Sequence, residues 1–211
     1  MFWSFRSPYS YLAIPQYLDL VKTYDLKINV RPVYPIAIRN PEFFETINPQ
    51  WIPYLMLDCA RIAEYRGMTF IWPRPDPVVI DREKGRISED QPYIHNITRL
   101  GVIASETGDG LEFLNVVSKS IFDGTTVDWH KPEILSQTVA AAGFNLDVLQ
   151  QQVTGHEVEI DSRIQQNQEA LEKSGHWGVP TLVYEGEPFF GQDRVDLALW
   201  RMKQNGLKTR T

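Results

Sequence analysis

The sequence contains a single cysteine, Cys59, among its 211 residues. One thiol excludes an intramolecular disulfide and any four-thiolate zinc site, and we expect no other metal site. The sequence also lacks an apolar run of roughly 18 residues, the length that a membrane-spanning helix needs. Its start lacks the basic stretch and apolar segment of a secretory signal. These absences predict a cytoplasmic protein with no membrane partner.

Positive charge is also scarce in this chain. Its 21 Lys and Arg residues are outnumbered by 27 Asp and Glu residues, which gives a net charge of −6 and a pI near 5.3. This acidity argues against a nucleic-acid-binding protein, because contact with phosphates requires a basic surface. Hydrophobic residues make up 43% of the chain, which is enough to bury a core and excludes a disordered tail protein.

The spacing of apolar residues predicts a β-α-β unit at the start of the chain. A β-prone segment from Phe2 to Phe5 precedes a helical pattern from Pro8 to Asp25, and residues alternate from Lys27 to Val33. Such a unit leads to a parallel pair of strands. Further helices are predicted at Tyr54 to Arg66, Tyr93 to Ser105, Leu111 to Phe122, Pro132 to Ala142, Leu146 to Val153 and Val158 to Lys173.

The end of the chain returns to β character. Thr181 to Tyr184 and Pro188 to Phe190 flank a Glu-Gly turn and predict a hairpin, and Asp193 to Lys203 predicts a last helix. The proline-rich residues 70–90, with a charged stretch at 81–86, are typical of a surface excursion with one hairpin. A helical insertion inside a small α/β sandwich explains this order of elements best.

The first candidate for chemistry is Ser7-Pro8-Tyr9-Ser10. A serine before a proline that opens a helix is also an ordinary N-cap, and taken alone this structural interpretation is favoured. The position favours a functional role, because the free N–H groups and the positive dipole end of a helix N-terminus attract an anion. Ser7 could hold a thiolate there, and Arg6 could add positive charge.

The second candidate is the segment from Gly175 to Thr181, which contains Val179-Pro180. Pro180 can mark a strand edge, or it can follow a cis peptide bond. A cis bond would turn the main-chain N–H and C=O of Val179 outward, where an extended peptide could pair with them. His176 is better interpreted as a loop residue than as a catalyst, and Trp177 as a packing residue.

The third candidate is the segment from Phe189 to Arg194, at the start of the last predicted helix. Asp193 can be an acidic residue that favours a helix start. Alternatively, Gln192 and Asp193 can recognise the amino and carboxylate groups of a ligand. The sequence leaves these two interpretations equally open.

Together the three segments resemble the 2-hydroxychromene-2-carboxylate isomerase family. That family is close to the kappa-class glutathione transferases and belongs to the DsbA-like thioredoxin-fold group. The resemblance spans nearly the whole chain, since Tyr54-Leu55-x-x-Asp58 and Asp128-x-x-Lys131-Pro132 match it too. It implies an α/β protein in which a thioredoxin-like domain, residues 1–34 and 155–211, carries a large inserted all-helical domain, residues 35–154. It also implies glutathione bound between the two domains, in a homodimer.

The resemblance gives Ser7 the place of the first cysteine in the redox relatives and Ser10 that of the second. Without those thiols, dithiol–disulfide exchange at this site is excluded. In the isomerases and the kappa transferases the first serine faces the sulfur of glutathione. By resemblance, Ser7 is therefore the catalytic residue, whose hydroxyl lowers the pKa of the glutathione thiol by hydrogen-bonding the thiolate.

The remaining contacts to glutathione are also implied by the resemblance. Val179, next to Pro180, would pair through its main chain with the cysteinyl part. Gln192 and Asp193 would hold the γ-glutamyl end. These assignments follow the positions of the family motif in this sequence.

The reaction that the resemblance implies is the interconversion of 2-hydroxychromene-2-carboxylate and trans-o-hydroxybenzylidenepyruvate. It proceeds by reversible addition of the thiolate to a conjugated double bond, and negative charge on the keto-acid end must be stabilised. Arg39, Asn40 and Asn48 are candidates for that role, although each alone is more typical of a loop or turn. Cys59 lies on the apolar face of its predicted helix and is expected to be a buried structural residue.

Two other functions fit the same residues. A kappa-type glutathione transferase or peroxidase would use the same cofactor site but would consume glutathione. A non-catalytic thioredoxin-like module would instead bind an extended peptide at the Pro180 edge, and free glutathione would stabilise it little.

Overall fold

The computed structural model describes residues 1–81 and 86–210 of the chain. Its main sheet has the strand order β2-β1-β5-β6, with β1 (Phe2–Trp3), β2 (Arg31–Pro32), β5 (Thr181–Tyr184) and β6 (Glu187–Phe190). β1 pairs in parallel with β2, and β5 pairs antiparallel with both β1 and β6. The sheet thus joins the two ends of the sequence, as the predicted α/β fold requires.

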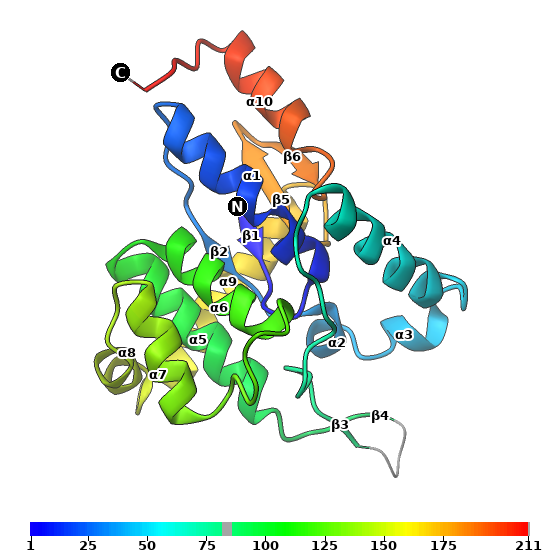
Figure 1. Cartoon of the computed structure of the whole chain (residues 1–211), viewed down its shortest axis with the longest axis vertical. Helices are drawn as coiled ribbons and strands as arrows, with labels where there is room; N and C mark the ends of the chain where they lie inside the picture. The colour runs from blue at the N-terminus through cyan, green and yellow to red at the C-terminus, as the bar shows by residue number, and fades with distance from the viewer. Residues whose placement is uncertain (82–85, 211) are drawn as a thin grey trace.

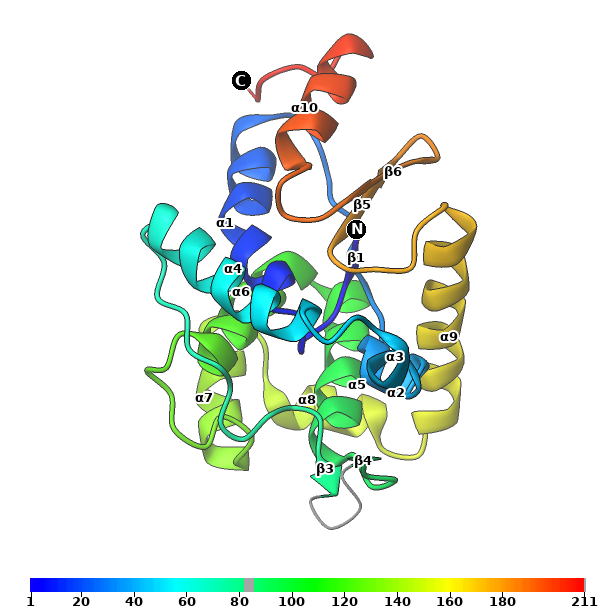
Figure 2. The ribbon, with the colours of Figure 1, turned by 90° about the vertical axis from the view of Figure 1, so that its right-hand side faces the viewer.

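Helices cover both faces of this sheet. Figure 2 shows α1 (Pro8–Thr23) and α10 (Val195–Gln204) on one side of the strands and α9 (Glu157–Lys173) on the other. α5 (Pro92–Thr107), α6 (Gly110–Phe122), α7 (Pro132–Ala141) and α8 (Leu146–Val153) gather at one end of the sheet (Figure 1). This confirms a thioredoxin-like fold with a mainly helical insertion; the boundaries given above at 34/35 and 154/155 stay a prediction.

The segment between the sheet and the helical block carries short helices and one long one. α2 (Ile36–Arg39) and α3 (Phe43–Thr46) lead into α4 (Trp51–Tyr65), which contacts α1. The predicted hairpin is present as β3 (Ile80–Asp81) paired with β4 (Arg86–Ile87). The charged residues 82–85 of that prediction lie outside the described residues.

Two predicted strands are shorter in the structure than their sequence pattern indicated. Residues 27–33 alternate as a strand should, but only Arg31–Pro32 pairs with β1. The pairing partner limits it, because β1 itself is confined to Phe2–Trp3 rather than residues 2–5. A strand needs a neighbour as well as a pattern, since its main-chain groups bond to another strand.

One continuous apolar core joins the sheet to the helices. Trp3 and Phe5 from the first strand region, Tyr17 from α1 and Leu114 from α6 are all buried in the same cluster. Gly101 of α5 lets the ring of Phe5 pack against the helix, because a Cβ there would lie 2.7 Å from a ring carbon. Within the described residues, no helix combines the length and the apolar character needed to cross a membrane.

Candidate functional site

Ser7 is the N-cap of α1 and lies directly after the first strand region. Its extended backbone (φ −89°, ψ 114°) places Pro8 at the first helical position. The Ser7 hydroxyl oxygen accepts a hydrogen bond from the Ser10 main-chain N–H at 3.2 Å, and the hydroxyl donates to the Val179 carbonyl at 3.2 Å. The N-cap prediction is confirmed, and the hydroxyl also joins α1 to a segment 172 residues away.

Val179 lies at the turn into β5, and the peptide bond between Val179 and Pro180 is cis. The Thr181 hydroxyl donates to the Gly178 carbonyl at 2.7 Å, which closes the turn. Among the described residues, the Val179 main-chain N–H has no hydrogen-bond partner. This N–H is therefore available to an incoming acceptor, whereas the Val179 carbonyl is engaged by Ser7.

A stack of three rings borders this turn. The His176 ring lies 3.9 Å from Phe190 and 5.6 Å from Trp177, centroid to centroid, and is nearly parallel to both. His176 Nδ1 accepts a hydrogen bond from the Gly178 N–H at 2.8 Å, and burial lowers the pKa of His176. The imidazole thus supports the loop, in agreement with the predicted loop role. Trp177 packs on Phe43, although 46% of Trp177 is exposed.

Gln192 and Asp193 lie in the tight turn between β6 and α10. Gln192 is half-buried and receives the guanidinium of Arg66, which donates to both its main-chain oxygen and its side-chain Oε1. Asp193 is exposed and accepts a 2.6 Å ion-paired hydrogen bond from Arg194. The turn therefore carries an anchored amide next to an accessible carboxylate.

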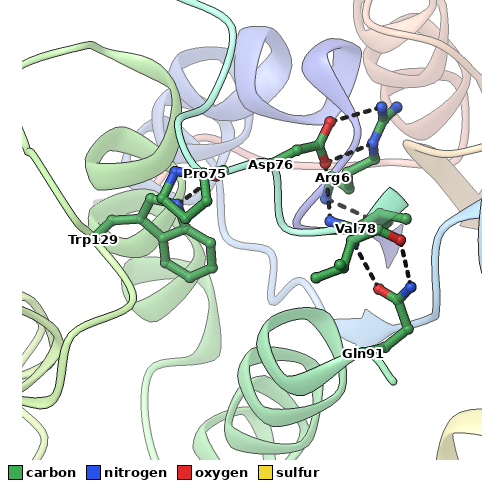
Figure 3. A network of polar contacts seen from close by, with 8 residues as sticks. Arg6, Pro75, Asp76, Val78, Gln91 and Trp129 are labelled. Atoms are coloured by element: carbon green, nitrogen blue, oxygen red, sulfur yellow. Dashed lines mark hydrogen bonds and ion pairs between the residues drawn. The ribbon is translucent and has the colours of Figure 1, made fainter. Parts of the chain in front are cut away.

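Arg6 does not leave a free positive charge beside Ser7. Its Nε and Nη2 atoms bind the carboxylate of Asp76 at 3.1 and 2.9 Å, and the two side chains point toward each other in Figure 3. Asp76 also accepts from the Val78 N–H at 2.9 Å. The ion pair connects Arg6, the residue before Ser7, to the proline-rich segment 70–90. Trp129 also anchors that segment, because its side chain donates a hydrogen bond to the Pro75 carbonyl.

Two further ionisable side chains of α1 and α4 are Tyr9 and Cys59. The Tyr9 hydroxyl donates to Asp58 at 2.7 Å, and burial together with that carboxylate raises the pKa of Tyr9. Cys59 is fully buried, and burial raises the pKa of its thiol to about 12. A thiol in that state is not a nucleophile at neutral pH, which confirms the structural role expected for Cys59.

The three candidates between β2 and α4 have different environments. Arg39 donates to the Tyr34 carbonyl at 2.7 Å and to the Trp177 carbonyl at 3.0 Å, which brings it to the loop that carries Val179. Asn40 and Asn48 are exposed, and the Asn48 side chain accepts from the Gln50 N–H within its own turn. Only Arg39 is therefore linked to the rest of the site by these contacts.

Sequence reasoning missed two residues of this region, Arg66 and Asp76. Each acts through a partner distant in the sequence, Gln192 for Arg66 and Arg6 for Asp76. The position of Arg66 as the last residue of a predicted helix gave no sign of a role in the site, because basic residues are common at helix C-termini. A cavity of about 760 Å³ is also present, lined by Ile28, Val102 and Arg163 among others and by none of the predicted site residues.

The site can thus receive a ligand with three different groups. The N-terminus of α1 and the Ser7 hydroxyl favour an anionic atom. The free Val179 N–H can pair with a peptide carbonyl, and the turn at Gln192 and Asp193 offers an amide and a carboxylate. The buried Ser10 hydroxyl, whose oxygen has no partner among the described residues, lies in the first turn of the same helix.

The chain matches one protein family in sequence and is similar in fold to solved structures. Residues 1–202 match the family described as DSBA-like thioredoxin domain. A solved structure of 2-hydroxychromene-2-carboxylate isomerase shares 17% identity, covers 96% of this chain and 93% of its own, and has a TM-score of 0.67. A probable DsbA oxidoreductase from Streptomyces coelicolor shares 12% identity over 96% of this chain and 87% of its own, with a TM-score of 0.61. No curated protein gives a significant match.

Proposed function

Since the chain belongs to the DsbA-like thioredoxin domain family, we propose that it is a glutathione-dependent isomerase of unsaturated aromatic keto acids. The observation that carries the proposal is Ser7, a hydroxyl at the N-terminus of α1 that faces the cis Val179–Pro180 turn. The proposed substrate is 2-hydroxychromene-2-carboxylate or a close analogue, the compound named for one structural neighbour.

A dithiol–disulfide reaction does not suit these residues. The other neighbour is named as a probable oxidoreductase, but here Ser7 and Ser10 occupy the first turn of α1. The one cysteine, Cys59, is buried with a raised pKa. Exchange requires an accessible thiolate, and the chain's own residues supply none.

The Ser7 hydroxyl is suited to stabilise a thiolate. The Ser10 N–H fixes the position of Oγ, so the proton of the hydroxyl can turn from the Val179 carbonyl to an anion by rotation alone. A hydrogen bond to an anion is roughly twice as strong as one between neutral groups, so the rotation is favourable. The chemistry that glutathione supplies, when bound, is reversible thiolate addition to a conjugated double bond.

The other polar groups fit the rest of glutathione. The free Val179 N–H can bind the peptide carbonyl of the cysteinyl unit, and the Val179 carbonyl becomes available once the Ser7 proton has turned away. Gln192 and Asp193 match the carboxylate and ammonium of the γ-glutamyl end. Arg39, held beside the same loop, is proposed to stabilise negative charge on the substrate, together with the exposed Asn40 and Asn48.

The first test is a thermal-shift titration with reduced glutathione, on wild type and on Asp193→Ala. A ligand that binds only the folded state stabilises it, by about 2.7 kcal/mol when the ligand is present at 100 times its Kd, and this stabilisation raises the melting temperature. We expect a rise that the substitution weakens. No rise at millimolar glutathione would reject the cofactor and favour the peptide-binding module instead.

The second test is turnover of 2-hydroxychromene-2-carboxylate by Ser7→Ala. Because the substitution removes a hydrogen bond to a developing anion, we expect turnover to fall by about 10²-fold. Loss of an N-cap also costs about 1 kcal/mol of stability, so Asn145→Ala at the cap of α8 is the matched control. That control should lose similar stability and keep full turnover.

Two outcomes would contradict the proposal. Full turnover by Ser7→Ala would remove the role of the hydroxyl. Stoichiometric loss of glutathione during the reaction would indicate a transferase, because an isomerase returns glutathione unchanged.

A further inference from the structure

Arg66 joins three parts of the molecule at one end of the candidate site. It is the C-cap of α4, and its Nη1 donates to the Leu12 carbonyl of α1 at 2.5 Å. Its Nη2 donates to the main-chain oxygen of Gln192 at 3.2 Å and also to the Gln192 Oε1. Arg66 is half-buried, and burial lowers its pKa, but an arginine remains charged at any ordinary pH.

This contact fixes which end of the Gln192 amide a ligand meets. A guanidinium has N–H donors and no acceptor, so the amide oxygen, and not the amide nitrogen, must face Arg66. The NH₂ group of Gln192 then points away from Arg66. In this orientation Gln192 offers a ligand two donors and no acceptor.

We propose that Arg66 is a positioning residue that makes Gln192 a receptor for the α-carboxylate of the γ-glutamyl group. The ammonium of that group is then left to the neighbouring Asp193, since the Gln192 oxygen is already occupied. The inference rests on the proposed use of glutathione and refines it: one residue of the turn reads the carboxylate and the next reads the ammonium.

Charge supports this division. Asp193 already carries one ion pair, to Arg194, on an exposed surface where such a pair is weak and readily exchanged. Its carboxylate suits an ammonium and repels a carboxylate. The half-buried guanidinium of Arg66 contacts the oxygen of the Gln192 amide, so its positive charge favours a carboxylate at the NH₂ group of that amide and disfavours an ammonium there.

The experiment measures the Kd of three peptides by calorimetry: glutathione, glutaryl-cysteinylglycine without the ammonium, and 4-aminobutyryl-cysteinylglycine without the α-carboxylate. In wild type, loss of the carboxylate should weaken binding by about tenfold or more, because a hydrogen bond to a charged group is lost. We call the Kd of the peptide without the α-carboxylate divided by the Kd of glutathione the carboxylate ratio. In Arg66→Gln, the carboxylate ratio should fall at least threefold. The ratio for the peptide without the ammonium should stay unchanged, since Asp193 is intact.

Two further variants separate positioning from folding. Arg66→Lys keeps the charge but cannot reach the Leu12 and Gln192 oxygens together, so its ratio should lie between wild type and Arg66→Gln. Arg61→Gln, an exposed position on the same helix, is the matched control and should change no Kd.

Gln192→Glu tests the same point without removing Arg66. Glutamate keeps an oxygen on the guanidinium but presents a second oxygen to the ligand instead of NH₂. We expect glutathione binding to weaken at least tenfold, with no such loss for the peptide that lacks the α-carboxylate.

The outcomes distinguish this inference from the proposed function. If wild type binds glutathione but the carboxylate ratio is unchanged in Arg66→Gln and Gln192→Glu, Arg66 has only a structural role and the inference is wrong. If wild type binds none of the three peptides, the cofactor itself is wrong and the role of Arg66 is rejected with it.

Discussion

Single residues in this protein join segments that are far apart in the sequence. The Ser7 hydroxyl caps α1 and also holds the cis turn at Val179, so one side chain connects the helix N-terminus to the segment before β5.

Gly178, next to that turn, allows two aromatic rings to pack closely against the main chain. A Cβ at Gly178 would lie 2.4 Å from a ring carbon of Phe190 and 3.0 Å from one of His176. The ring stack can approach the turn only because this residue has no side chain.

Gly178→Ala should therefore displace the Phe190 ring and open the turn. We expect a loss of about 1–3 kcal/mol in the free energy of unfolding, the usual cost of overpacking. Chemical denaturation of the single variant and of Gly178→Ala/Phe190→Ala forms a double-mutant cycle. If the ring contact causes the loss, the alanine should cost much less once Phe190 is removed. An equal cost in both backgrounds would reject this explanation.

Elements could be predicted from sequence where their own residues determine them. The helix predicted at 146–153 ends where α8 ends, and that at 132–142 differs from α7 by one residue, since caps and prolines mark these boundaries. The strand predicted at 27–33 was too long because its length depends on its neighbour β1. The same is true of the candidate site. Ser7 and Val179 could be identified because they lie in motifs of adjacent residues, whereas the contact between Arg66 and Gln192 spans 126 residues of sequence and leaves no local pattern.

The loop that carries Asp76 depends on one buried side chain. Gln91, 4% exposed at the start of α5, accepts from the Val79 N–H and donates to the Val79 and Ser88 carbonyls, each at 2.8 Å. These bonds add to the main-chain hydrogen bond from the Ser88 N–H to the Val79 carbonyl. Figure 3 shows the Gln91 side chain pointing toward the segment that contains Val78. An apolar residue at position 91 would leave the Val79 N–H and the Ser88 carbonyl without a hydrogen-bond partner, whereas the Val79 carbonyl would keep the Ser88 N–H at 3.0 Å.

Gln91→Leu should loosen this loop and lower the free energy of unfolding by about 1–3 kcal/mol, the cost of an unsatisfied buried group. Hydrogen exchange should accelerate at Val79, whose amide loses its acceptor. Gln151→Leu on α8, an exposed position, is the control and should leave exchange at Val79 unchanged. Unchanged protection of Val79 in Gln91→Leu would show that other contacts hold the loop.

At the scale of the whole molecule, one polar cluster links the sheet edge to the helices on either side. Asp161 of α9 accepts from the Tyr34 hydroxyl at 2.7 Å and from two nitrogens of Arg99 on α5 at 2.8 and 2.6 Å. Tyr34 lies just after β2, its ring contacts His95 of α5, and its carbonyl accepts from Arg39. The cluster therefore connects the insertion, the sheet and the loop beside the candidate site.

Asp161 should make the stability of this arrangement depend on pH. Burial alone would raise the pKa of Asp161, but the hydrogen bonds from Arg99 and Tyr34 and the charges of Arg99 and His95 outweigh it, so the net shift is downward. A carboxyl group whose pKa is lower in the folded state stabilises the fold above its unfolded pKa of about 3.9. That contribution is lost as the pH falls through the folded value.

Asp161→Asn should therefore be less stable than wild type at pH 7, by about 1–2 kcal/mol, because Asp161 is partly exposed and solvent screens the pair. Urea denaturation between pH 2 and 7 measures the difference, which should be constant above about pH 5 and shrink below pH 4 as the wild-type carboxyl is protonated. Asp19→Asn, at an exposed position on α1, controls for the loss of one negative charge. A difference that stays the same down to pH 2 would mean that the ionised carboxylate is not what holds β2, α5 and α9 together, since the neutral acid would then serve as well.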